Sequence, residues 1–140
     1  KGRALAALAR REYSRLELAR KLRPHAESVE QLDAVLDALA ADRLLSNERF
    51  AESLARRRGE RFGVARVKQG LKSHQLAPEL IAAQVDVLRE SEYARARQVL
   101  EKRFGAPPAE PAARLRQMRF LAARGFSSDV IRRVVGGEDD

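Results

Sequence analysis

The side chains in this sequence that most clearly suit a chemical task are the positive charges near its middle. They are Arg56, Arg57, Arg58, Arg61, Arg66, Lys68 and Lys72, and only Glu60 interrupts them. Proteins bind phosphate groups with positive donors that are held along one face. Arginine suits this task because its guanidinium is planar and always charged. The cluster therefore predicts a surface that binds phosphate or an acidic partner.

Two smaller basic groups lie toward the two ends of the chain. The group toward the C-terminus contains Arg114, Arg116, Arg119 and Arg124. Arg116 and Arg119 are three residues apart, so on a helix they share a face. The group toward the N-terminus contains Arg10, Arg11 and Arg15, followed by Arg20 and Lys21. All three groups are candidate binding residues.

The overall composition agrees with a basic binding protein. The chain has 140 residues, with 28 Lys or Arg against 20 Asp or Glu, and a formal net charge of +8. Of the basic residues, 23 are Arg and 5 are Lys. A GC-rich genome would favour Arg over Lys, but it would not create the surplus of positive charge. The length fits one domain or a few small repeats.

The residues required by the common catalytic and metal sites are missing from the sequence. There is no Cys, and the two His are His25 and His74. No phosphate-binding glycine loop, zinc-ligand spacing or Ser/His/Asp arrangement is present. Carboxylate pairs such as Asp33 and Asp37 lie at helical spacing, which favours solubility or a contact with a basic partner over acid–base chemistry. We therefore expect no enzyme activity, no catalytic residues, no metal and no cofactor.

The sequence also bears on where the protein works. No apolar run approaches the roughly 18 residues that a membrane span needs. We expect a soluble cytoplasmic monomer that does not bind a membrane.

Helical spacing of apolar residues runs through the chain, and it predicts an all-α fold with nine short helices. The first is expected to end near Tyr13. Capping boxes at Ser14 and Ser28 open the next two, and Ser46 or Asn47 caps a fourth. A fifth helix is expected after Gly63, a sixth from Pro78, and a seventh from about 92 to 103, before Gly105. The eighth helix is expected to end at Gly125, and the ninth to begin after Ser127.

Similar positions recur about 42 to 50 residues apart, as in Leu22 and Leu71 or Leu76 and Phe126. This spacing predicts three degenerate three-helix repeats, at 1–45, 46–90 and 91–136, and an acidic tail at 137–140. No linker rich in Pro or Gly separates them. We therefore expect one elongated, curved array of right or left hand.

The charge follows the same period. The net charge is positive in three segments, with +5 at 1–27, +6 at 56–74 and +6 at 95–124. It is negative in the segments between and after them, with −4 at 28–55, −3 at 75–94 and −2 at 125–140. If the repeats stack regularly, the basic segments form one stripe and the acidic segments another. The alternative is a set of solvated helix faces with local ion pairs.

Four strings together resemble the RecX family of recombination regulators. They are REYSRLEL at 11–18, LLSNERFAE at 44–52, RFGVARVKQ at 61–69 and RFLAARGFS at 119–127, so the resemblance spans nearly the whole chain. Three positions depart from the family pattern. Gly70 replaces an acidic residue, Gln75 replaces a turn glycine, and Asn47 replaces a common Asp. None of these changes removes a basic residue.

The resemblance implies a non-enzymatic regulator of the RecA recombinase. Such a protein would bind RecA and its filament on single-stranded DNA, lodge in the filament groove and restrain ATP hydrolysis, strand exchange and co-protease activity. That role would modulate recombination, DNA repair and the SOS response. The basic residues could contact either RecA or DNA phosphate. Inhibition could come either from capping the growing filament or from occupying its groove.

Two other functions remain compatible with the sequence. A helix-turn-helix transcriptional regulator would place one basic recognition helix in the major groove of DNA. The spread of charge over three repeats fits backbone contact better than such base reading. A structural adaptor would use its charges only for solubility. Binding to RecA–DNA filaments, bare DNA and free RecA at two salt concentrations would separate the three.

Overall fold

The structure is a computed structural model that describes residues 1–136, and within this range every regular element is a helix. The all-α prediction is therefore confirmed. The predicted acidic tail at 137–140 lies outside the described residues. The α-helices are α1 (Gly2–Arg10), α2 (Arg15–Leu22), α3 (Val29–Ala41), α4 (Asn47–Gly59), α5 (Val64–Lys72), α6 (Pro78–Phe104), α7 (Pro111–Ala123) and α8 (Ser128–Gly136).

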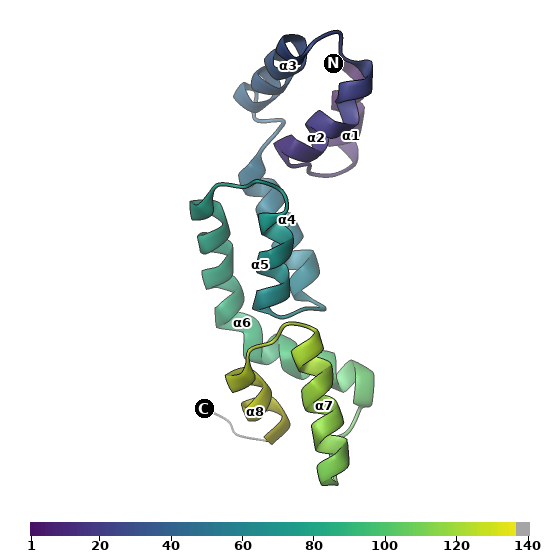
Figure 1. Cartoon of the computed structure of the whole chain (residues 1–140), viewed down its shortest axis with the longest axis vertical. Helices are drawn as coiled ribbons and strands as arrows, with labels where there is room; N and C mark the ends of the chain where they lie inside the picture. The colour runs from purple at the N-terminus through teal and green to yellow at the C-terminus, as the bar shows by residue number, and fades with distance from the viewer. Residues whose placement is uncertain (137–140) are drawn as a thin grey trace.

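The helices are arranged as three groups along one long axis (Figure 1). We call α1, α2 and α3 unit 1; α4, α5 and the first half of α6 unit 2; and the second half of α6, α7 and α8 unit 3. A 3-10 turn at Arg23–His25 follows α2 inside unit 1. The array is elongated, so most side chains of each unit lie near solvent.

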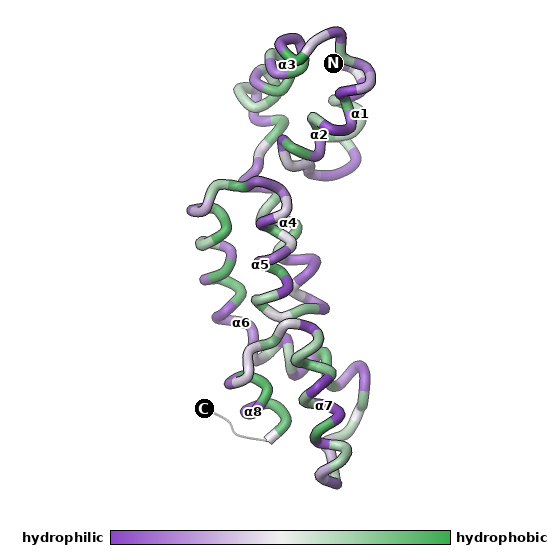
Figure 2. The backbone as a smooth tube through the Cα atoms, in the orientation of Figure 1, coloured by the Kyte–Doolittle hydropathy of each residue, from purple (hydrophilic) through white to green (hydrophobic). Residues whose placement is uncertain are grey.

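Each unit has an apolar core of its own. Leu18, Leu36 and Leu39 belong to the core of unit 1, and Phe50 and Leu71 to that of unit 2. The core of unit 3 includes Ala96, Leu121, Phe126 and Ile131. Apolar and polar stretches alternate along the helices, and no helix is apolar throughout (Figure 2). Short amphipathic helices of this kind are stable only when packed against neighbours.

Most of the predicted helix starts are found where the sequence placed them. Ser14 Oγ accepts the Glu17 N–H and the Glu17 carboxylate accepts the Ser14 N–H, which makes a complete capping box. Ser46 caps α4, Ser127 Oγ accepts the Val130 N–H, and Pro78 is the first residue of α6.

The capping box predicted at Ser28 is only half present. Ser28 Oγ accepts the Gln31 N–H, but the Gln31 side chain accepts from the Glu27 N–H instead of from Ser28. The box is incomplete because Gln31 reaches one residue further back along the chain.

Two other predictions were wrong. The first helix ends at Arg10 and not near Tyr13, because the chain is extended at Arg11 before the Ser14 cap. Nine helices were predicted, but residues 1–136 contain eight, because the helices expected from Pro78 and from about 92 are one helix, α6. The boundary predicted between residues 90 and 91 therefore lies within a continuous helix. No Pro or Gly lies near that point to break it.

Although α6 is continuous, it changes direction near its middle (Figure 1). In this region the Leu88 carbonyl accepts hydrogen bonds from Ser91 Oγ (3.3 Å) and from the Arg95 guanidinium (2.8 Å). Side chains that compete for a helical carbonyl in this way bend helices. The bend allows one helix to serve two units.

The turn before α6 contains one of the departures from the family pattern. Gln75 has a φ of +54°, in the left-handed region where glycine is favoured. The corresponding residue of unit 3 is Gly125, with a φ of +87°. A non-glycine residue in this conformation costs about 1–2 kcal/mol, which the buried Leu76 next to it helps to offset.

Across residues 1–136, none of the helices is both long and apolar enough to cross a membrane.

Candidate functional site

Two of the predicted basic groups meet at the junction between units 2 and 3. The ring of Phe62, in the loop between α4 and α5, is surrounded by three guanidinium groups. The Cζ atoms of Arg66, Arg124 and Arg61 lie 4.7, 5.4 and 5.7 Å from its centre. Arg61 and Arg66 belong to the central basic group and Arg124 to the C-terminal one, so tertiary folding joins the two.

The same arrangement continues along unit 3. Arg124 also lies 4.8 Å from the centre of the Phe120 ring, and Arg103 lies 5.8 Å from it. The Phe120 ring packs edge-on against Phe104, with 5.4 Å between ring centres. The resulting arginine–phenylalanine cluster is made of Arg61, Arg66, Arg103, Arg124, Phe62, Phe104 and Phe120.

The cluster presents positive charge with restricted side-chain motion. Each cation–ring contact is worth about 0.5–1 kcal/mol at an exposed site. One guanidinium nitrogen of Arg66 donates to the Ala123 carbonyl (2.8 Å), and one of Arg124 donates to the Arg61 carbonyl (3.2 Å). The remaining N–H groups of the fork can meet an anion. None of the four arginines forms an ion pair among the described residues.

The position of the cluster is set by a close backbone contact. The Gly63 N–H donates to the Arg124 carbonyl (2.8 Å), and the Ala65 N–H donates to the Gly125 carbonyl (3.2 Å). A Cβ at Gly63 would collide with backbone atoms of Gly125 and Phe126. Only glycine fits here, so the Phe62 loop is held directly against the turn that carries Arg124.

A buried carboxylate strengthens the same junction. Glu92, on α6, is only 4% exposed. Its Oε2 accepts the Val64 N–H at the start of α5 (3.0 Å), and its Oε1 accepts a hydrogen bond from Ser127 Oγ, at the start of α8 (3.2 Å). A negative charge is favourable at a helix N-terminus, and here one carboxylate serves two helices. Glu92 is not among the predicted site residues, although an acidic residue in the middle of the apolar stripe of a helix is a usable signal.

Arg95, one turn further along α6, was also missed. Its guanidinium donates to the carbonyls of Gly59 (2.7 Å) and Phe62 (2.8 Å) and so holds the end of α4. Burial lowers the pKa of Arg95, and the nearby Glu92 opposes this effect. This arginine is therefore part of the support beneath the cluster and not part of its surface.

The junction between units 1 and 2 is built differently, mainly from side chains. Asn47 Oδ1 accepts the Arg15 N–H (2.9 Å), and Arg49 pairs with Glu12 (2.9 Å). The apolar cores of the two units remain separate. Unit 1 is thus attached mainly through partly buried side-chain contacts, whereas units 2 and 3 share a helix and a backbone contact.

His74 lies at this first junction. Its Nδ1 is 3.3 Å from Ser14 Oγ, and its ring packs edge-on against Phe50, with 4.7 Å between ring centres. Burial lowers the pKa of His74; Arg58, Arg11 and Arg20 act in the same direction, and Glu17 opposes them. Ser14 is fully buried and caps α2, so this Ser–His contact is structural.

We expect the free energy of unfolding to fall as the pH drops from about 7.5 to about 5.5. The folded chain protonates His74 at a lower pH than the unfolded chain, which protonates it near the ordinary pKa of about 6.5. The unfolded state then binds more protons, so this stabilisation is complete above that pKa and is lost as the pH falls. Urea unfolding at both pH values measures the difference. His74→Gln should reduce it and His25→Gln should not; equal pH dependence in wild type and His74→Gln would contradict the expectation.

The predicted residues of the N-terminal basic group lie apart from the arginine–phenylalanine cluster. In the N-terminal group, Arg11 pairs with Glu17 (3.2 Å), which raises the pKa of Arg11, and Arg15 pairs with Asp37 (2.8 Å). Arg10 lines a surface hollow of unit 1 together with other cations. Two of the three predicted residues thus have carboxylate partners of their own, and none of them joins the arginine–phenylalanine cluster.

The exposed members of the other two groups are distributed over α4, α5 and α7. Arg56, Arg57 and Arg58 form the exposed last turn of α4, just before the Phe62 loop. Lys68 and Lys72 border a groove between α5 and α6. The exposed arginines of α7 are Arg114, Arg116 and Arg119.

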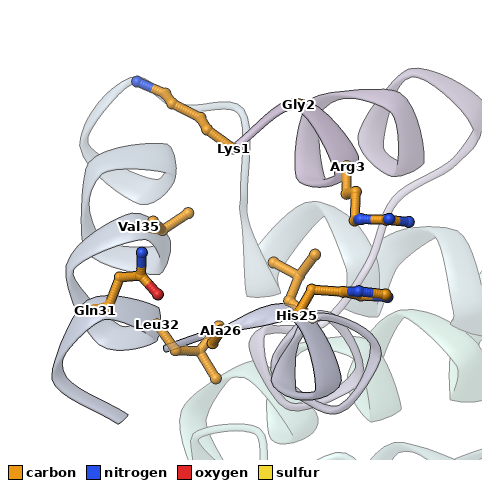
Figure 3. A pocket seen from close by; sticks show the side chains of 9 residues that line it. Lys1, Gly2, Arg3, His25, Ala26, Gln31, Leu32 and Val35 are labelled. Carbon is orange, nitrogen blue, oxygen red and sulfur yellow. The ribbon is translucent and has the colours of Figure 1, made fainter. Parts of the chain in front are cut away.

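A hollow of about 330 Å³ lies in unit 1 and is shown in Figure 3. Arg3 and His25 extend in the same direction on one side of it, and Leu32, Ala26 and Val35 lie on the other. No carboxylate, serine or cysteine lines it. In the part of the chain that the structure describes, no three His, Cys, Asp or Glu side chains are placed to hold a metal ion.

Comparison with known proteins gives consistent matches. The family model described as RecX, third three-helix domain, matches residues 90–135. The regulatory protein RecX of Ralstonia pickettii (strain 12J) is 51% identical over 100% of this chain and 88% of its own length. That of Herbaspirillum seropedicae is 48% identical over 94% of this chain and 86% of its own length.

Solved structures show the same fold. The crystal structure of RecX from Lactobacillus salivarius matches with a TM-score of 0.80, covering 99% of this chain and 93% of that chain at 18% sequence identity. At this level of identity the likeness concerns the arrangement of the helices.

Proposed function

This chain belongs to the RecX family of regulatory proteins, and we propose that it acts on the RecA recombinase. It binds RecA and the RecA filament on single-stranded DNA, in the groove of the filament. By doing so it restrains ATP hydrolysis, strand exchange and co-protease activity, and thereby modulates recombination, DNA repair and the SOS response. It works by occupying a surface, without catalytic residues or a cofactor of its own.

The observation that carries this proposal is the arginine–phenylalanine cluster. Its four guanidinium groups have no carboxylate partner among the described residues, and two of them are held in place by backbone carbonyls. Positive groups fixed in this way suit the phosphates of a nucleoprotein filament or an acidic protein surface.

The distribution of these groups supports contact with backbone and shape over base reading. Arg61 lies in the α4–α5 loop, Arg66 on α5, Arg103 on α6 and Arg124 at the end of α7. A helix-turn-helix regulator reads bases with neighbouring side chains of a single recognition helix. We therefore propose that any DNA contact is made without sequence preference.

The test replaces Arg56, Arg57 and Arg58 by Glu. These side chains are exposed members of the central basic group, whereas Arg66 and Arg124 also hold the unit 2–unit 3 junction. We expect the concentration needed for half-maximal inhibition of the RecA ATPase on single-stranded DNA to rise about tenfold, because charge complementarity is reversed. The corresponding Gln variant should lie between this variant and wild type.

The matched control reverses three exposed cations outside the predicted groups, Arg3, Arg23 and Lys102, which changes the net charge equally; none of them forms an ion pair within residues 1–136. Circular dichroism verifies that each variant is folded, since acidic residues in the last turn of α4 also oppose its helix dipole. Unchanged inhibition by the folded Arg56/Arg57/Arg58→Glu variant, or an equal loss of inhibition in the control, would refute the proposal that the central basic group contacts the RecA filament.

A further inference from the structure

The central basic group is divided between two opposite faces of α5. Arg66 contributes to the arginine–phenylalanine cluster, and Lys68, two residues later, borders a groove on the other side. Residues two apart on a helix point in nearly opposite directions. Lys72 follows Lys68 by one turn and borders the same groove. The two faces of α5 are therefore separate surfaces that need not bind the same partner.

The groove between α5 and α6 combines an apolar floor with a basic rim. It is an open hollow of about 530 Å³. The floor is formed by the edges of the core residues Leu76, Ile81 and Val85, which are 5–8% exposed, together with the exposed Pro78 and Ala82. The rim cations are Lys68, Lys72 and Arg89. Asp86 is the one acidic residue among the lining side chains. None of the rim cations forms an ion pair within residues 1–136.

We propose that this groove binds an acidic amphipathic segment of a protein partner, with its apolar side chains on the floor and its carboxylates at the rim. Lys68 and Lys72 are one helical turn apart, so they match carboxylates spaced i, i+4 on a bound helix. An amphipathic helix laid into a groove is a common mode of recognition. This inference deepens the proposed function, because it names the chemistry of the segment that the regulator holds.

The lining of the groove favours a protein over a nucleic acid. Its floor is aliphatic and no aromatic side chain lines it, so unpaired bases have no ring to stack on. A phosphate backbone would use only the rim and leave the apolar floor unoccupied. An acidic segment with Leu or Phe side chains uses both, and burial of apolar area adds to the charge attraction.

The probe is a synthetic helical peptide with Leu at i, i+3, i+4 and i+7 and Glu at the other positions. Bound to the ¹⁵N-labelled full chain, it should shift the amide signals of Leu76, Ala82 and Val85. A peptide with Ser in place of Leu should bind about tenfold more weakly. Oligo(dT) is the comparison for phosphate and should shift signals around Phe62 instead. No binding of the Leu peptide, or shifts confined to the Phe62 region, would overturn the proposal.

A pair of variants tests the rim. Lys68→Glu/Lys72→Glu should weaken binding of the Leu peptide about tenfold or more, while Lys21→Glu/Lys102→Glu, with the same change in net charge, should leave it within about twofold. Equal weakening by both pairs would overturn the proposal. Because RecA is absent from these measurements, their failure is distinguishable from failure of the ATPase test.

Discussion

Gly63→Ala is expected to lower the free energy of unfolding by about 3 kcal/mol. The added methyl group would collide with backbone atoms of Gly125 and Phe126, which cannot move aside as a flexible side chain would. To relieve the collision, the start of α5 must withdraw from the α7–α8 turn. That movement breaks the hydrogen bonds from the Gly63 and Ala65 N–H groups to the Arg124 and Gly125 carbonyls.

The loss should be visible in two measurements. Urea unfolding followed by circular dichroism gives the change in stability, and an effect of this size is a large part of the 5–15 kcal/mol typical of a folded domain. NMR spectra should show the largest changes at residues of the arginine–phenylalanine cluster, because Phe62 precedes Gly63 directly.

Gly70→Ala is the matched control, since it makes the same chemical change in α5 itself. The new Cβ would meet only the end of the Arg58 side chain, at 4.0 Å. Replacement of glycine by alanine inside a helix should raise stability by up to about 1 kcal/mol. If Gly63→Ala were as stable as Gly70→Ala, the close contact at the junction would not be a constraint on the fold.

The second large effect is expected from Glu92→Ala, at about 2–4 kcal/mol of lost stability. Removing the carboxylate leaves the Val64 N–H and the Ser127 hydroxyl without their acceptor and opens a gap beneath both helix starts. Glu92→Gln should cost less, because its amide oxygen can still accept one of the two hydrogen bonds. The exposed Glu90, on the same helix, provides the control Glu90→Ala, which should change stability by less than about 0.5 kcal/mol.

Hydrogen exchange distinguishes this specific role from a general loss of packing. In wild type the Val64 amide is protected by the Glu92 carboxylate, so Glu92→Ala should accelerate its exchange more than that of Val67, one turn further into α5. Uniform acceleration along α5 would show that Glu92 stabilises the unit only through its volume.

The two junctions between the units are held by contacts of different kinds. Units 2 and 3 are joined by α6, by the Gly63–Gly125 contact and by Glu92, and the arginine–phenylalanine cluster lies across this junction. Unit 1 is held by contacts such as Glu12–Arg49 and by His74, whose pKa is lowered by burial. Loosening of the array under acid or salt should therefore begin between units 1 and 2.

The sequence alone determined the features that depend on near neighbours in the chain. Helical class follows from apolar residues spaced three and four apart, and helix starts follow from caps such as Ser14 and Ser46. The repeat of similar positions predicted the sequence of helices, except that residues 89–91 contain nothing to end a helix and α6 runs through them. The identity of the basic segments was also readable, because charge is a property of each residue.

Only the tertiary structure decided which charges act together. Arg66 and Arg124 are far apart in the sequence, and no local pattern shows that both lie over the Phe62 ring. Lys68 was grouped with Arg66 by proximity along the chain, although the helix places them on opposite faces. Gly63 and Glu92 acquire their importance only where units 2 and 3 meet, because a collision or a shared carboxylate exists only between segments that folding has brought into contact.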